Sequence, residues 1–130
     1  MSARDGLRSR LGRVRGLGSA KEGAAHWWAQ RLTAIALVPL TFWLVASLAG
    51  LWGATHAEVI AWLRGPVAPV VMIALLIAGF HHLQLGLQVV IEDYVHSEAA
   101  KWTLIIAAKL GSVFAGLIGI VAVLRIAFGA

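Results

Sequence analysis

The sequence contains no cysteine and few charged residues. Its 130 residues include no Cys, only 6 Asp and Glu together, and 13% charged residues against 60% hydrophobic ones. The absence of cysteine excludes disulfides, thiolate zinc sites, iron–sulfur ligation and a cysteine nucleophile. A soluble domain carries about 25% charged and 45–50% apolar residues, and a chain this short cannot hide so much apolar surface from water. The composition therefore predicts one lipid-embedded domain.

Three long apolar stretches account for most of the chain, and they cover residues 32–52, 67–91 and 102–128. About 20 helical residues cross a bilayer core of about 30 Å, and backbone groups in lipid must be hydrogen-bonded internally. The sequence has no ten-residue alternation that would favour strands. We predict an all-α integral membrane protein: a basic arm over residues 1–30, then a three-helix membrane domain over residues 31–130.

The positive charges indicate how the spans are oriented. Of the 11 Lys and Arg, seven lie at or before Arg31, and the second connection, residues 92–101, adds Lys101. The first connection and the C-terminal region contribute only Arg64 and Arg125. Because Lys and Arg gather on the cytoplasmic side, we expect the N-terminus in the cytoplasm of a bacterium, at its inner membrane. The matrix side of a mitochondrial inner membrane is the alternative.

The basic arm could in principle contact nucleic acid, but it lacks interleaved aromatic residues and directly precedes a span. We therefore expect membrane lipid, and no nucleic acid, as its partner. Leu7, Leu11 and Val14 would share one face of a helix lying on anionic lipid. A disordered arm is the alternative, because Gly12 and Gly16 weaken a helix there.

The second span carries two adjacent histidines, His81 and His82. At about 100° per residue, four residues share a helical stripe with His82: Leu75, Gly86, Val89 and Asp93. His81 points about 100° away from that stripe. An intramembrane histidine can bond to a neighbouring helix, ligate haem iron or relay protons, and the spacing alone leaves these three roles open.

Other polar residues lie near the predicted cytoplasmic end of the spans. Asp93 and Tyr94 can form a solvated helix end with an interfacial anchor, or a hydrogen-bonding site for a lipid-soluble ligand. Arg31 can be a snorkelling anchor or the partner of an anion such as a haem propionate. We identify no catalytic residue, because paired carboxylates and Ser/His/Asp arrangements are absent from the sequence.

The third span contains Gly111, Ala115 and Gly119, which are spaced by four residues. Small residues at this spacing allow helices in a membrane to pack closely. Three helices of this length bury little against each other, so we also expect helices from a partner subunit.

The residues of the second span resemble a known family. The pattern His82-x-x-x-Gly86-x-Gln88-Val89-x-x-x-Asp93-Tyr94, in the second of three spans, is similar to that of the hydrophobic membrane anchor subunits of succinate dehydrogenase, respiratory complex II. The segment from Arg31 to Ile35 at the start of the first span is similar to that family as well.

This resemblance implies a four-subunit enzyme. A flavoprotein subunit and an iron–sulfur subunit would oxidise succinate, while this chain and a sister cytochrome b subunit anchor them and pass electrons to ubiquinone. The two anchors would share a haem b, with His82 as an axial ligand of the iron and Arg31 near a propionate or the quinone region. Tyr94 and Asp93 would form part of the quinone site.

Three points stay open beside this resemblance. The extra histidine, His81, leaves a second choice for the haem ligand. A fumarate reductase anchor carries out the same chemistry in reverse. A non-redox membrane scaffold or transporter subunit is the alternative from another functional class.

Overall fold

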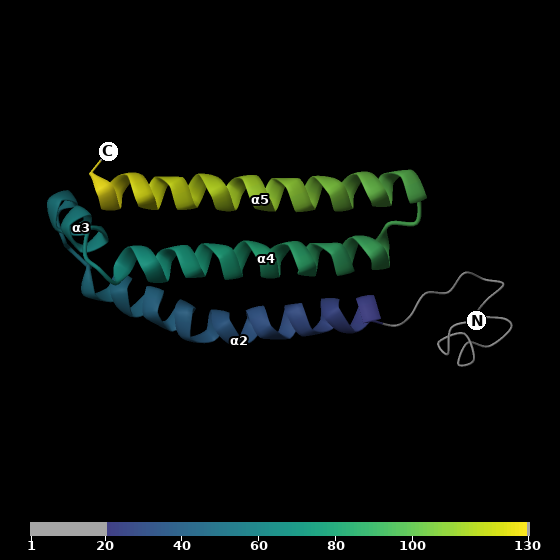
Figure 1. Ribbon diagram of the computed structural model, residues 1–130, viewed down its shortest axis with the longest axis horizontal. Helices are drawn as coiled ribbons and strands as arrows, with labels where there is room; N and C mark the ends of the chain where they lie inside the picture. The colour runs from purple at the N-terminus through teal and green to yellow at the C-terminus, as the bar shows by residue number, and fades with distance from the viewer. Residues whose placement is uncertain (1–20, 130) are drawn as a thin grey trace, which may run out of the picture.

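Helices make up almost all of the described chain. The computed structural model describes the backbone of residues 21–129 and the side chains of residues 23–129. Its helices are α2 (Lys21–Gly50), α3 (His56–Leu63), α4 (Ala68–Tyr94) and α5 (Glu98–Phe128) (Figure 1). Three of them, α2 from Gly23 onward, α4 and α5, are long and apolar enough to cross a membrane. The predicted all-α class with three spans is confirmed.

At the end of the layer where α2 begins, the long helices extend beyond the apolar stretches that define them in the sequence. α2 begins at Lys21, well before residue 32, and α5 begins at Glu98 rather than at Trp102. A helical backbone can continue into the lipid headgroup layer, where polar side chains are solvated. The apolar stretch therefore marks the part of a helix in the hydrocarbon core. Most of the basic arm, including the predicted lipid-facing residues Leu7, Leu11 and Val14, lies outside the described residues.

The first connection contains a short helix that the apolar pattern does not predict. Thr55 caps α3: its hydroxyl accepts from the Glu58 backbone N–H, and its own N–H donates to the Glu58 carboxylate at 2.7 Å. The bonds from the Thr55 N–H and hydroxyl lower the pKa of Glu58 below its ordinary value. Trp62 of α3 stacks on Trp43 of α2, with ring centroids 5.6 Å apart. These contacts fix α3 at the end of the bundle opposite the start of α2 (Figure 1).

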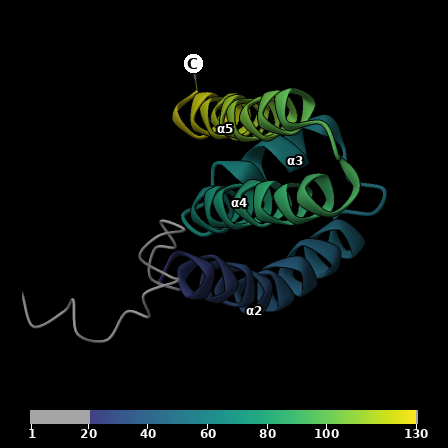
Figure 2. The ribbon, with the colours of Figure 1, turned by 90° about the vertical axis from the view of Figure 1, so that its right-hand side faces the viewer.

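The three long helices form a single layer with α4 in the middle. α4 packs against α2 on one side and α5 on the other, and within residues 21–129 α2 makes no packing contact with α5. Figure 2 shows this order along the bundle axis. α2 bends along its length in both views. Pro39 lies inside this helix and removes a backbone hydrogen bond there, which is a common cause of a bend.

The interface between α4 and α5 is built on small residues. A Cβ added to Gly116 would lie 3.4 Å from Phe80, and one added to Gly119 would lie 3.1 Å from Leu76. Ser112, one turn before Gly116, is buried. By contrast, Gly111 is exposed and faces open space. The predicted small-residue face is therefore rotated: Gly119 belongs to it and Gly111 does not, because Ser112 and Gly116 meet α4 instead.

α2 has the most open surface of the three spans. No side chain that the structure describes in α2 falls in the buried class, whereas α4 and α5 each contribute buried residues. Seven of its large apolar side chains are more than half exposed: Trp28, Leu32, Ile35, Val38, Phe42, Val45 and Leu48. In a membrane such a surface contacts lipid tails or the helices of another subunit.

Candidate functional site

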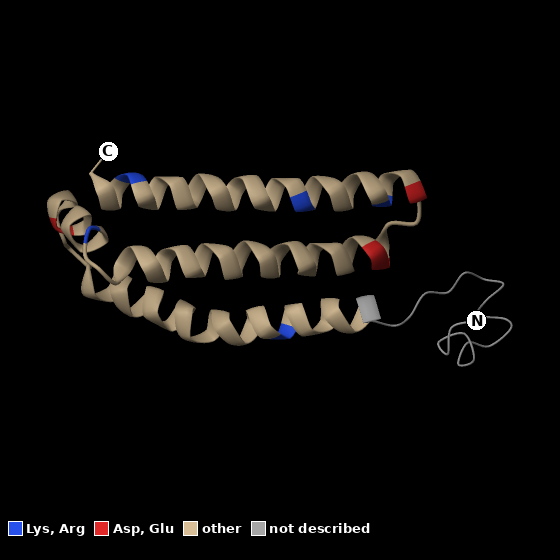
Figure 3. Ribbon diagram, in the orientation of Figure 1, with Lys and Arg blue, Asp and Glu red and all other residues tan. Residues whose placement is uncertain are grey.

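The predicted site residues gather in the half of the bundle where α2 begins and α4 ends. The start of α2, the end of α4 and the start of α5 lie at the same end of the layer (Figure 1). Arg31 lies in the first half of α2, and Asp93 and Tyr94 close α4. Figure 3 shows that charged residues mostly lie towards the two ends, and that the long helices between them are largely uncharged. The fold therefore brings residues from two helices to one side of the membrane.

His82 contacts α2 through its side chain. The Nδ1 of His82 lies 3.0 Å from the hydroxyl oxygen of Thr33, 49 residues earlier. The Thr33 hydroxyl also lies 2.7 Å from the carbonyl oxygen of Ala29 and 3.0 Å from that of Gln30, both in the preceding turn of α2. His82 is half-buried. One nitrogen of its ring is therefore engaged by α2, and Nε2 is the nitrogen left for another partner.

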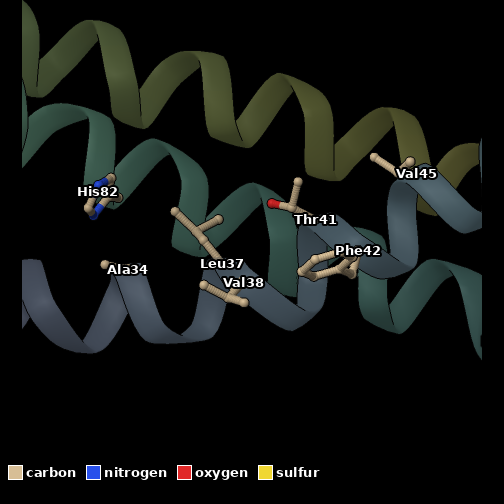
Figure 4. Close-up of a pocket in the computed structure, with 7 residues that line it drawn as sticks. All are labelled: Ala34, Leu37, Val38, Thr41, Phe42, Val45 and His82. Carbon is tan, nitrogen blue, oxygen red and sulfur yellow. The ribbon is translucent and has the colours of Figure 1, made fainter.

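The ring of His82 lines an apolar groove of about 440 Å³. All the other lining residues come from α2: Ala34, Leu37, Val38, Thr41, Phe42 and Val45 (Figure 4). Figure 4 shows His82 reaching from α4 towards α2 at one end of this groove, with Val45 at the other. The groove is open outward, because Val38, Phe42 and Val45 are more than half exposed. A flat apolar group could enter it from outside the chain and meet the imidazole.

His81 lies on a different side of α4. It is exposed and lines a second pocket, of about 200 Å³, together with Gln84 of α4 and Ser112 and Gly116 of α5. Thus His82 faces the α2 side and His81 the α5 side, as expected from a rotation of about 100° between adjacent residues. The two histidines cannot serve the same ligand site without rotation of α4.

Gly86 follows His82 by one turn, and the side chain of Gln30 occupies the space beside it. A Cβ on Gly86 would lie 3.7 Å from the amide nitrogen of Gln30. The Oε1 of Gln30 and the Nε2 of His26 are both buried and have no hydrogen-bond partner among the described residues. His26, Gln30 and Thr33 therefore form a polar stripe on the α4-facing side of α2. Sequence reasoning missed this stripe, although its i, i+4, i+7 spacing is visible in the sequence.

Arg31 lies on another side of α2. It is exposed, and its guanidinium carbon lies 4.3 Å from the centroid of the Trp27 ring, one turn earlier. A cation over an indole face is held by the ring's electron density, and Trp27 is itself 49% exposed. The Arg31–Trp27 pair thus keeps a positive group at the surface of α2, where an anion can reach it.

Asp93 and Tyr94 form the exposed end of α4. Tyr94 is 77% exposed, and the preceding carboxylate, Glu92, accepts a 2.8 Å hydrogen bond from the amide of Gln88. Gln88 therefore binds the carboxylate of Glu92 and not that of Asp93, which is the one next to Tyr94 in the chain. Tyr94 follows His82 by twelve residues, which is about 18 Å along a helix axis. The imidazole and the phenol therefore lie at different depths in the membrane.

The described residues contain no group of three or more His, Asp or Glu side chains close enough to hold a metal ion. A metal centre at His82 would need a ligand from another chain or from a cofactor. This requirement agrees with the open groove, which can be closed only from outside α2 and α4.

Comparison with known proteins identifies the family. A model of the succinate dehydrogenase/fumarate reductase transmembrane subunit family matches residues 6–123. The chain is 39% identical over 119 residues to the succinate dehydrogenase hydrophobic membrane anchor subunit of Rickettsia bellii, covering 90% of this chain and 94% of the relative.

Two further relatives agree with this match. The subunit of the same name from Paracoccus denitrificans is 30% identical over 96 residues, which is 74% of each chain. The succinate dehydrogenase membrane anchor subunit of Reclinomonas americana is 31% identical over 84 residues, or 62% of this chain and 70% of the relative. No solved structure matches significantly. On the extent of these matches, this multi-pass membrane protein belongs to the family of succinate dehydrogenase and fumarate reductase transmembrane subunits.

Proposed function

We propose that this chain is the hydrophobic membrane anchor subunit of a succinate:quinone oxidoreductase. The observation that carries the proposal is the family match over residues 6–123, which includes all of α2, α3 and α4 and most of α5. Its partners are then a flavoprotein subunit, an iron–sulfur subunit and a sister cytochrome b anchor. The chain takes part in the enzyme without binding succinate itself.

The groove between α2 and α4 fits one part of a b-type haem. Its walls are apolar, and its imidazole keeps Nε2 available because Nδ1 contacts Thr33. His82 would hold the haem iron through Nε2, together with a residue of the sister subunit. A haem bound there would supply one-electron transfer. Arg31, one turn before the groove residue Ala34 on α2, would pair with a propionate through its guanidinium.

Asp93 and Tyr94 support a ubiquinone site at the end of α4. The reduction of a quinone requires hydrogen bonds to its carbonyl oxygens and two protons from water. The exposed phenol of Tyr94 can donate to a carbonyl oxygen, and the carboxylate of Asp93 can exchange protons with water. Both residues lie in the last turn of a long apolar helix, so a lipid-soluble quinone can reach them from the bilayer.

The placement of the positive charges supports an N-terminus in the cytoplasm, at the inner membrane of a bacterium. Arg31 and Lys101 lie towards the end of the layer where α2 begins, and Arg64 and Arg125 lie towards the opposite end. The seven Lys and Arg at or before Arg31 give the first end the larger positive charge. The soluble subunits would dock at that end, beside Tyr94. Relatives from Rickettsia and Paracoccus support a bacterial membrane.

Deletion of the gene tests the proposal directly. Without this chain, the flavoprotein and iron–sulfur subunits should be found in the soluble fraction and still oxidise succinate with an artificial dye. Ubiquinone reduction by membranes should fall to background, and a tagged copy of the chain should restore it and co-purify with three subunits. Unchanged succinate:quinone reductase activity in the deletion strain would contradict the proposal. Faster fumarate reduction by quinol than succinate oxidation would identify the enzyme as a fumarate reductase.

A further inference from the structure

Thr33 places one hydroxyl group among three possible hydrogen-bond partners. Its oxygen lies 2.7 Å from the Ala29 carbonyl oxygen, 3.0 Å from the Gln30 carbonyl oxygen and 3.0 Å from the Nδ1 of His82. A hydroxyl has one hydrogen to donate and two lone pairs to accept with. The two carbonyl oxygens can only accept, so either of them must receive the hydroxyl hydrogen. The third contact must then be one in which the oxygen of Thr33 accepts.

This count assigns the hydrogen positions on His82. The hydroxyl hydrogen of Thr33 goes to the carbonyls of its own helix, and Ala29 is the nearest of the three partners. The lone pair that faces His82 then requires a hydrogen on Nδ1. A neutral imidazole carries one N–H hydrogen, so Nε2 keeps the lone pair that a metal ion needs.

The same contact also fixes the orientation of the ring. Thr33 is β-branched and therefore stiff at χ1, and its hydroxyl is held by the preceding turn of α2. A bond to this fixed point restricts rotation of the imidazole about its own side-chain torsions. The histidine on α4 is thus oriented by a residue on α2.

We propose that Thr33 is a positioning residue that holds His82 with Nδ1 protonated and Nε2 directed to a metal ion in the α2–α4 groove. The inference rests on the proposed function for the identity of the metal, a haem iron. It adds a role for Thr33, the residue of the polar stripe of α2 that contacts His82.

Three variants of the assembled complex test this role. Thr33→Val keeps the branched shape and removes the hydroxyl, and Thr33→Ser keeps the hydroxyl and removes the methyl. Thr103→Val is the matched control, because the hydroxyl of Thr103 also donates to the carbonyl oxygen four residues earlier, that of Ala99, while Thr103 lies on α5 and does not line the groove. The measurements are haem per flavin, the haem midpoint potential and the electron paramagnetic resonance spectrum of the oxidised haem.

Thr33→Val should weaken haem retention in detergent by about tenfold to hundredfold, the usual effect of losing the outer partner of a metal-bound histidine. The midpoint potential should move upward, because an imidazole that no longer donates from Nδ1 is a weaker donor to oxidised iron. The resonance spectrum should broaden as the ring gains freedom. Thr33→Ser should restore all three measurements towards the wild type, and Thr103→Val should leave them unchanged.

Several results would overturn the inference. They include an unchanged or lower midpoint potential in Thr33→Val, a failure of Thr33→Ser to restore it, and equal effects from Thr103→Val. If Thr33→Val does not assemble, Thr33→Ala provides the same comparison without the branched side chain. Loss of haem ligation in His82→Leu together with an unaffected Thr33→Val would reject the role of Thr33 and keep the proposed function.

A measurement without haem separates the two proposals further. Nitrogen-15 resonance of histidine-labelled complex from cells that make no haem, with the His82 signal assigned by its loss in His82→Leu, reports which ring nitrogen carries hydrogen. We expect Nδ1–H in the wild type and a mixture in Thr33→Val. The same mixture in both proteins would reject the positioning role, whatever ligand the groove holds.

Discussion

The Nε of Arg64 donates a 3.1 Å hydrogen bond to the carbonyl oxygen of Ile126, 62 residues later in the chain. Arg64 follows α3 directly, and Ile126 lies in the last turn of α5. The last carbonyl groups of a helix have no partner within that helix, and a positive charge there is favourable. The arginine therefore closes α5 and links it to the first connection.

We predict that Arg64→Gln loosens the last turn of α5. The lost bond is exposed, so the local cost should be about 0.5–1 kcal/mol. Hydrogen exchange should quicken for the amides of residues 125–129 and stay unchanged in the middle of α5. Arg64→Lys, which keeps the charge, should give an intermediate rate. Equal exchange in all three proteins would show that the contact does not stabilise the helix end.

A second prediction concerns the contact between α4 and α5. Gly116→Leu should force Phe80 away and lower the thermal stability of the purified complex, because overpacking costs about 1–3 kcal/mol. Gly111→Leu is the control, because a side chain at Gly111 meets open space, and it should melt like the wild type. A comparable loss in both variants would mean that Gly111 is covered by a partner subunit.

The two histidines should differ in their effect on the haem. His82→Leu removes the imidazole from the α2–α4 groove and should convert a low-spin spectrum to five-coordinate haem or abolish it. His81→Leu should leave the spectrum largely intact, because His81 faces the α5 side. Optical spectra of reduced and oxidised membranes measure both effects. The reverse result would transfer the ligand role to His81.

Tyr94→Phe should separate quinone reduction from the earlier steps. The change removes only the phenolic hydroxyl, the group proposed to donate to a quinone carbonyl oxygen. Succinate:quinone reductase activity should fall at least about tenfold, the loss expected for one hydrogen bond to the reacting group, while dye-linked succinate oxidation and the haem spectrum stay near the wild type. Full activity with normal quinone affinity would leave Tyr94 as an interfacial anchor.

The orientation of the spans in the membrane can be tested with single-cysteine variants, because the natural chain has no cysteine. A cysteine placed at Ala57 in α3 should react with a membrane-impermeant thiol reagent added outside intact cells. A cysteine at Ser97, in the connection between α4 and α5, should react only after the cells are opened. Labelling of Ser97→Cys in intact cells without labelling of Ala57→Cys would reverse the predicted orientation.

The sequence is most informative about the spans and less so about their contacts. Apolar length alone predicts three transmembrane helices, because lipid leaves the backbone no alternative. It does not predict α3, although Thr55 and Glu58 carry the spacing of a capping box, because the short apolar run between two spans resembles an ordinary connection. It also places the start of α2, the end of α4 and the start of α5 too far inward, because hydropathy reports depth in the membrane rather than helical conformation.

Contacts between helices depend on how each helix is rotated about its axis and how far it is shifted along its neighbour. The sequence pattern does not determine either quantity. Periodicity places His81 and His82 on different sides of α4, but it does not say which helix each one meets. Gly111 and Gly119 have the same spacing pattern, yet only Gly119 meets Leu76. Thr33 and His82 are 49 positions apart in the chain, and their contact can be identified only once α2 and α4 are packed together.

The open surface of α2 has a consequence for how long an unassembled copy of the chain persists in the cell. A copy that has not met its partner subunits carries a first span with one neighbour and no buried side chain among those described. Elements with few buried contacts open most readily, so α2 is where degradation of an unassembled copy would begin. Partner helices that cover α2 would remove this starting point. The amount of this protein in the membrane would then follow the supply of its partners rather than its own rate of synthesis.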